Sequence, residues 1–205
     1  AQDLLASPVP NVQTLGAIIL LNHATPPDQL PQGVLAGLIQ SPTPQVRQAG
    51  VRLFGRLPEA KLLENYAVIA AFCVSPYTEV RQAAQPIVQG LVEKHPDFGQ
   101  NLLAELLPYL SRREAYEGLH EDLFQLFTGP LDGFGSQIDR ETTLQLLLSG
   151  HAFAQQYGFA LLQKNIPPEQ LSVRQIIWLA NHEMLGVRRY AWQIFNDQTP
   201  RMQAE

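Results

Sequence analysis

The sequence predicts an all-α protein, an α-solenoid of about five to six helix-turn-helix repeats. Three observations lead to this fold class. A short segment recurs at a fixed interval of 34 residues, apolar residues follow each copy at helical spacing, and no segment shows the sustained alternation that is typical of strands. A repeat period between about 20 and 50 residues is typical of stacked repeat architectures.

The 34-residue interval is clearest in the first half of the chain. Its copies are Ser7-Pro8-Val9-Pro10-Asn11-Val12, Ser41-Pro42-Thr43-Pro44-Gln45-Val46 and Ser75-Pro76-Tyr77-Thr78-Glu79-Val80. Beyond each valine, apolar positions fall at offsets 0, 3, 4, 7 and 8, which form one face of a helix. The same template predicts six such helices, with first core positions at Val12, Val46, Val80, Tyr116, Ala154 and Val187.

The residue at offset 4 predicts how closely these helices approach their neighbours. It is small in five copies, namely Gly16, Gly50, Ala84, Gly158 and Ala191, and it is His120 in the remaining one. A small side chain there allows a neighbouring helix to approach closely. We expect His120 to pack in a slightly wider helix contact, or alternatively to form a pH-sensitive joint between helices.

A second set of apolar segments lies between these helices and predicts the first helix of each pair. These segments cover residues 30–39, 62–74, 98–110, 142–148 and 173–180. Prolines stand ahead of four of them, where the missing N–H is tolerated. Pro86 lies inside its helix and is expected to bend it.

Composition narrows the class of protein. The 205 residues carry 45% hydrophobic and 16% charged side chains, enough for one globular domain, 1–205, and a net charge of -5 indicates no general affinity for nucleic acid. The single cysteine, Cys73, excludes an internal disulfide, and the longest apolar run, residues 66–74, is about half of what a membrane helix needs. We expect a cytoplasmic protein, and because Ala1 begins inside a repeat, a fragment of a longer chain.

The segment Pro44-Gln45-Val46-Arg47-Gln48-Ala49-Gly50 resembles the HEAT repeat, and the resemblance extends over nearly the whole chain. It implies stacked helix pairs with a concave surface built mainly from the second helices. Arg47, Arg81 and Arg188 occupy the arginine position of the family pattern. The family's upstream aspartate is replaced by Ser7, Ser41, Ser75, Ser111, Ser149 and His182. Serine cannot form an ion pair, so the resemblance does not carry over the family's aspartate–arginine ladder. Residues 110–123 are also similar to HEAT arrays of large bacterial proteins that carry a WGR domain, which would lie elsewhere in the full chain.

Positions outside the apolar stripe of the second helices predict the binding surface. Offsets 2, 6 and 9 there are rich in glutamine, with few charges. The candidate binding residues are Gln48, Arg52, Gln82, Gln89, Asp122, Gln125, Gln156, Gln163 and Arg189. They favour a non-catalytic scaffold that binds a protein segment. Alternatively the glutamines are simply good helix formers on solvated faces, or the chain is a nucleic-acid-binding or DNA glycosylase-like HEAT protein, or a passive spacer.

No residue pattern indicates catalysis, a metal or a cofactor. No two of the five histidines have the i, i+4 spacing of a helical metal site. The glycine-rich loop 128–136 lacks the Gly-Lys-Ser/Thr of a phosphate-binding loop and is interpreted as an insertion between repeats, and Cys73 as an inert core thiol. Ala17, Ile18 and Leu21 near one end and Trp192 near the other are apolar where related positions are polar. We expect them to contact neighbouring repeats, or a partner.

Overall fold

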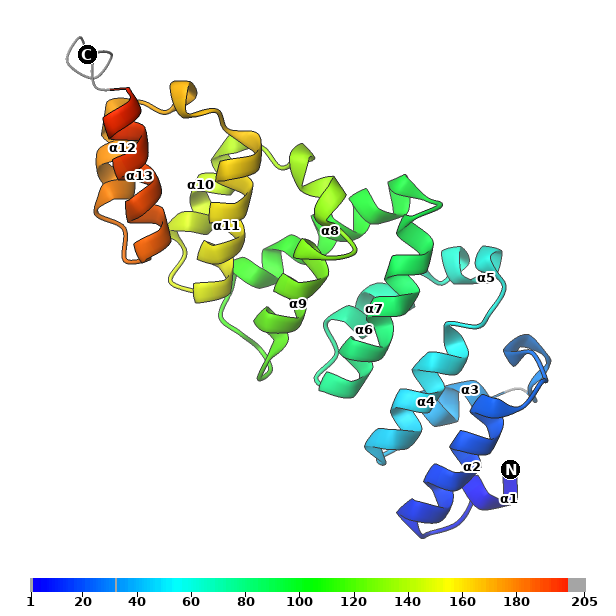
Figure 1. Cartoon of the computed structure of the whole chain (residues 1–205). Helices are drawn as coiled ribbons and strands as arrows, with labels where there is room; N and C mark the ends of the chain where they lie inside the picture. Colours follow the sequence, from blue (N-terminus) through cyan, green and yellow to red (C-terminus); the bar gives the residue numbers. More distant parts are fainter. Residues whose placement is uncertain (1, 32, 199–205) are drawn as a thin grey trace. The chain divides into compact units, whose positions relative to one another are not determined.

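The computed structural model describes residues 2–31 and 33–198, and the regular elements in this part of the chain are all helices (Figure 1). The helices are α1 (Gln2–Leu5), α2 (Pro10–Asn22), η1 (Pro27–Gln29), α3 (Val34–Ile39), α4 (Pro44–Phe54), α5 (Glu59–Glu64), α6 (Tyr66–Cys73), α7 (Thr78–Val92), α8 (Pro96–Ser111), α9 (Leu119–Thr128), η2 (Asp132–Gln137), α10 (Arg140–Leu148), α11 (Ala152–Asn165), η3 (Pro168–Gln170), α12 (Val173–Ala180) and α13 (Leu185–Asp197). The prediction of an all-α protein is therefore confirmed for the described residues.

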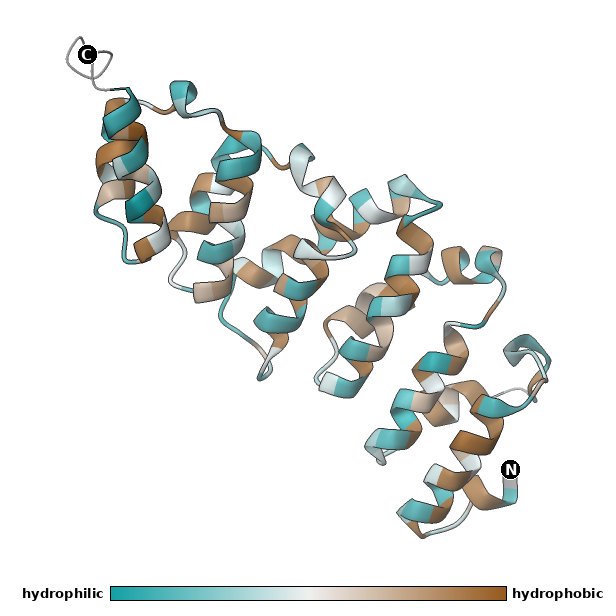
Figure 2. Ribbon diagram, viewed as in Figure 1, coloured by the Kyte–Doolittle hydropathy of each residue, from teal (hydrophilic) through white to brown (hydrophobic). Residues whose placement is uncertain are grey.

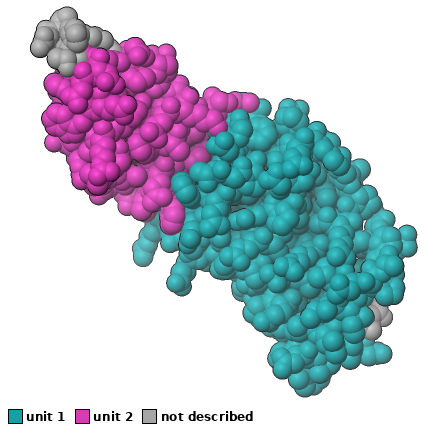
Figure 3. Space-filling model, viewed as in Figure 1, with its two compact units in different colours: residues 1–135 teal, residues 136–205 magenta. Residues whose placement is uncertain are grey.

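The chain divides into two compact units, residues 1–135 and 136–205 (Figure 3). The division falls inside the glycine-rich segment 128–136, which the sequence predicts to be an insertion between repeats. From the sequence a single domain, residues 1–205, is expected.

Helices that follow one another along the chain pack as antiparallel partners in both units. In unit 1 the partners are α1 with α2, α3 with α4, α6 with α7, and α8 with α9. The second helices of these pairs also pack on one another, α2 on α4, α4 on α7, and α7 on α9. In unit 2, α10 pairs with α11 and α12 pairs with α13.

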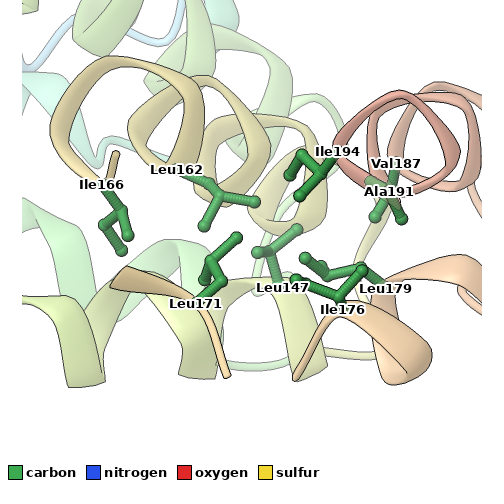
Figure 4. Close-up of a cluster of buried hydrophobic side chains, with 9 residues drawn as sticks. All are labelled: Leu147, Leu162, Ile166, Leu171, Ile176, Leu179, Val187, Ala191 and Ile194. Atoms are coloured by element: carbon green, nitrogen blue, oxygen red, sulfur yellow. The ribbon is translucent and has the colours of Figure 1, made fainter. Parts of the chain in front are cut away.

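The predicted apolar stripe is fully buried in α4, α7 and α11. All five stripe residues are buried in α4, from Val46 to Phe54, in α7, from Val80 to Val88, and in α11, from Ala154 to Leu162. In unit 2, Leu162 of the α11 stripe meets Leu147 of α10, Leu179 of α12 and three stripe residues of α13 in one hydrophobic cluster (Figure 4). The three are Val187, Ala191 and Ile194.

Three stripes depart from the prediction. In α13, Tyr190 is half-buried and Phe195 is 40% exposed. In α2 only Gly16 of the predicted core residues is buried, while Leu15 and Ile19 are 52% and 40% exposed, and Figure 2 shows the C-terminal turns of this helix as largely hydrophobic. The helix predicted to begin its core at Tyr116 instead begins at Leu119, and Tyr116 is exposed. The reason is Gly118, whose φ of 75° places the N-cap in the left-handed region that favours glycine.

Some first helices are shorter than predicted. Residues 30–39 contain only α3, and residues 62–74 are divided at Asn65, which ends α5 and caps α6. The amide N–H of Asn65 donates to the carbonyls of Lys61 and Leu62, which closes the last turn of α5. The segments 98–110, 142–148 and 173–180 lie within α8, α10 and α12 as predicted.

The small residues at offset 4 do allow close helix approach. A Cβ atom added to Gly50 would lie 2.8 Å from the backbone nitrogen of Ile39, and one added to Gly158 would lie 2.9 Å from that of Leu147. Both partners lie eleven residues upstream. His120 keeps the same interval, because its Nε2 bonds to the carbonyl oxygen of Tyr109 at 3.0 Å while the side chain is 4% exposed. The packed-histidine interpretation is confirmed: a hydrogen bond between helices stands here in place of the close contact.

Candidate functional site

A serine or histidine closes the turn between two helices in five of the repeats, whereas Ser111 of the fourth lies inside α8. Ser41 Oγ accepts a hydrogen bond from the N–H of Thr43, and Ser75 Oγ accepts one from Tyr77. The same interaction recurs at Ser7 and Ser149, and His182 Nδ1 accepts the N–H of Met184 in the last repeat. These side chains satisfy turn N–H groups, as expected for serine near a helix N-terminus.

The residue six positions after this serine or histidine ties the same turn to its helix. Arg47 Nη1 donates to the carbonyl oxygens of Ser41 and Pro42 at 2.8 and 3.0 Å. Arg81 Nη1 donates likewise to Ser75 at 2.8 Å. The corresponding donors in the other turns are Gln13, Gln155 and Arg188. We call these five residues the turn donors.

Four turn donors also reach the next helix pair. Arg47 donates to Glu79 Oε1 from Nε at 2.8 Å and from Nη2 at 2.5 Å, and Arg81 Nε donates to Asp122 Oδ2 at 2.5 Å. Gln13 accepts from the hydroxyl of Thr43 at 2.9 Å, and Gln155 donates to Glu183. We call these four contacts the polar ladder.

The polar ladder corrects one inference from the sequence. The upstream serines indeed form no ion pair, but two arginines are paired, because the carboxylates come from a different position, the first turn of the following second helix. A carboxylate there is also stabilised by the helix dipole. The carboxylate of Asp122 is used in this way, and the residue is only 7% exposed, so it does not belong to an exposed binding surface as the sequence predicted.

The other candidate binding residues lie on the second helices. In unit 1, Gln48 is half-buried and Arg52 exposed on α4, Gln82 and Gln89 are exposed on α7, and Gln125 is exposed on α9. Gln48 and Gln82 have the same register on two helices that pack together. In unit 2, Gln156 and Gln163 are exposed on α11 and Arg189 is exposed on α13.

Two grooves on unit 1 repeat with the same 34-residue interval, and the sequence analysis did not predict them. The first has a volume of about 620 Å³ and the second about 430 Å³. Residues at equivalent repeat positions, 34 apart, line both grooves. In the first groove they include Gln13, Leu38, Ser41, Pro42 and Val46, and in the second Arg47, Phe72, Ser75, Pro76 and Val80. The recurring Ser-Pro pair was the available signal. Arg47 lies in the second groove with its guanidinium carbon 3.7 Å from the ring centroid of Tyr77.

The pKa values of Cys73 and Glu59 are shifted by different causes. Burial raises the pKa of the Cys73 thiol to about 12, so the thiolate that a nucleophile requires is disfavoured. On the surface, hydrogen bonds from Lys94 and His95 lower the pKa of Glu59. Within residues 2–31 and 33–198, no three or more His, Cys, Asp or Glu side chains gather where they could hold a metal ion.

The described helices also fail the length and hydropathy requirements for crossing a membrane. Comparison with known proteins gives no family: no family model, no curated protein and no solved structure matches this chain.

Proposed function

We propose that this chain is a HEAT-like α-solenoid segment that binds a protein partner through the exposed faces of its second helices, without catalysis. In unit 1 this surface comprises Gln48, Arg52, Gln82, Gln89 and Gln125. One observation carries the proposal: α2, α4, α7 and α9 pack in succession, and the polar ladder fixes their register. Amide side chains that repeat along such a row face a partner at regular intervals.

The chemistry of the row favours a protein segment over nucleic acid. A glutamine amide both donates and accepts hydrogen bonds, which matches the backbone of an extended or helical polypeptide. Among the described residues of α2, α4, α7 and α9, Arg52 is the only exposed basic side chain. A phosphate backbone requires several such cations, because counterion release at basic groups supplies most of its affinity.

The buried cysteine fits the same proposal. Cys73 is free and 4% exposed, as is common for proteins of the reducing cytosol, and we therefore include a cytoplasmic location in the proposal.

The experiment compares three forms of the chain as bait in the native cell extract: wild type, Gln48→Glu/Gln82→Glu, and a matched control, Gln100→Glu/Asn101→Asp. Gln100 and Asn101 are exposed on α8. The control variant therefore carries the same added charge, but outside the proposed surface. We expect a partner that the wild type and the control retain and that the glutamine variant loses at least tenfold. A partner retained equally by all three forms would place the binding site elsewhere. Retention of nothing by any form would favour a spacer.

A further inference from the structure

The forward side of a second helix, by which we mean the side that packs on the following helix pair, has two recurring contact positions. The first is the turn donor, as Arg47 shows by its bonds to Glu79 of α7. The second lies four residues later. Phe159 occupies it in α11, and its ring lies 5.7 Å from that of Tyr190 in α13 and next to Gly186. In α2 and α4 the second position is held by Ala17 and Val51, both 0% exposed, and in α7 by Gln85, which is half-buried.

In α13 these two positions are Arg188 and Trp192. Arg188 Nη1 donates to the carbonyl oxygens of His182 and Glu183 at 2.8 and 2.7 Å. Arg47 makes the same two bonds to Ser41 and Pro42, so Arg188 is held in the same manner. What differs is the other edge of the guanidinium.

The Nε and Nη2 atoms of Arg47 bind a carboxylate of the next pair, whereas Arg188 has no carboxylate within 4.0 Å among residues 2–31 and 33–198. Trp192 is 57% exposed, although its counterparts on α2 and α4 are fully buried. An oriented guanidinium edge next to an exposed indole combines a charged and an apolar contact, as in known binding hot spots.

We propose that this forward face of α13 is a docking site for an α-helical hairpin whose second helix carries a carboxylate in its first turn. The carboxylate would accept the free edge of Arg188, as Glu79 accepts Arg47, while an apolar side of the same helix covers Trp192. The site belongs to unit 2 and shares no residue with the surface proposed for unit 1, so it is a second interaction surface.

Charge complementarity distinguishes this occupant from a second copy of the chain. The residue of α2 that corresponds to Glu79 is Asn11, 68 residues earlier, and its uncharged amide offers no ion pair. In a second copy, the exposed side chains of Leu15 in α2 and of Val9 at its N-cap could cover the indole of Trp192. They would leave Arg188 without a counter-ion. The acidic hairpin satisfies both groups.

The test uses a hairpin of known chemistry, a second copy of residues 65–94 with its Glu79, joined by a flexible linker to the end of the full chain. Linking gives the hairpin a high effective concentration, so weak docking is detectable. The sequence has two tryptophans, so the substitution Trp178→Phe leaves Trp192 as the single tryptophan of the full sequence. The readouts are the emission maximum of Trp192 and its quenching by acrylamide.

We expect the fused hairpin to shift Trp192 emission to shorter wavelength and to reduce its quenching constant at least twofold. Either Arg188→Glu or Glu79→Arg in the added copy should remove that protection, and the two together should restore it. Equal quenching of the fused and unfused chains would overturn the proposal, and so would protection that is insensitive to both charges. Concentration-dependent self-association of the unfused chain that Trp192→Ser abolishes would also overturn it, in favour of a second copy.

Discussion

Arg81 Nε lies 2.5 Å from Asp122 Oδ2, although the two residues are 41 positions apart and belong to different helix pairs. The Arg81 side chain is 1% exposed, and its remaining nitrogens donate to Ser75, Thr78 and Glu117. A buried guanidinium with this many acceptors has its desolvation offset by hydrogen bonds. The pair therefore fixes α9 against α7 in one register.

The stacking of Tyr77 on Arg47 should contribute modestly to stability. We expect Tyr77→Ala to lower the free energy of unfolding by about 0.5–1 kcal/mol, because the ring is partly exposed and its cation–π contact is partly hydrated. Tyr77→Phe keeps the ring and should leave stability unchanged in urea titrations. An equal loss for both variants would assign the effect to the hydroxyl instead.

The close contact at Gly50 predicts a sharp difference between two glycines. Gly50→Ala places a methyl group 2.8–2.9 Å from the backbone of α3, which should cost about 1–3 kcal/mol of stability. Gly90 on α7 has nothing within 4 Å, so Gly90→Ala should stabilise the helix by about 0.5–1 kcal/mol. Thermal and urea unfolding of both variants measure the signs, and a neutral Gly50→Ala would contradict the packing described.

Cys73 should be inert in the folded protein. Its pKa of about 12 and its burial predict that a thiol reagent at about pH 8 modifies it at least a hundredfold more slowly in the native state than in denaturant. The rate of absorbance change with an aromatic disulfide reagent gives both values. Comparable rates in the two states would show that α6 opens readily.

Asp139 caps α10 and predicts a pH dependence in unit 2. Its carboxylate accepts from the backbone N–H and the hydroxyl of Thr142, and these bonds lower its pKa. The cap therefore stabilises the fold above the unfolded pKa of about 3.9, and this contribution is lost as the pH falls through the lower folded value.

At neutral pH we expect Asp139→Ala to lose about 1 kcal/mol of stability, and Asp139→Asn to lose much less, because asparagine also caps helices. The difference between wild type and Asp139→Ala should shrink in acid unfolding series below about pH 3.9. A difference that persists unchanged at the lowest pH would contradict the assignment of the charged carboxylate as the cap.

The helices and their close contacts could be predicted because they follow from local periodicity. The apolar template placed Gly50 and Gly158 at the helix contacts, and the structure confirms both. The template was wrong at the start of the fourth helix. It placed a core position at Tyr116, but Gly118 sets the start of α9 through its backbone conformation, which the apolar spacing does not encode.

The polar ladder could be predicted only in part. The turn donors Arg47 and Arg81 stand at a fixed register, but their partners Glu79 and Asp122 do not share one with each other. A long arginine side chain reaches any carboxylate in the first turn of the next helix, so sequence position does not identify the acceptor. For the same reason the sequence predicts a surface position for Asp122, whereas the residue is the buried partner of Arg81.

A double-mutant cycle on Arg81 and Asp122 tests most directly the claim that the polar ladder joins successive helix pairs of unit 1. Arg81→Met and Asp122→Leu should each lower the free energy of unfolding by about 3–5 kcal/mol, because each leaves a buried charge unpaired. The double variant should recover part of this loss, with a coupling energy of about 1–3 kcal/mol in urea unfolding. Strictly additive losses would contradict the claim.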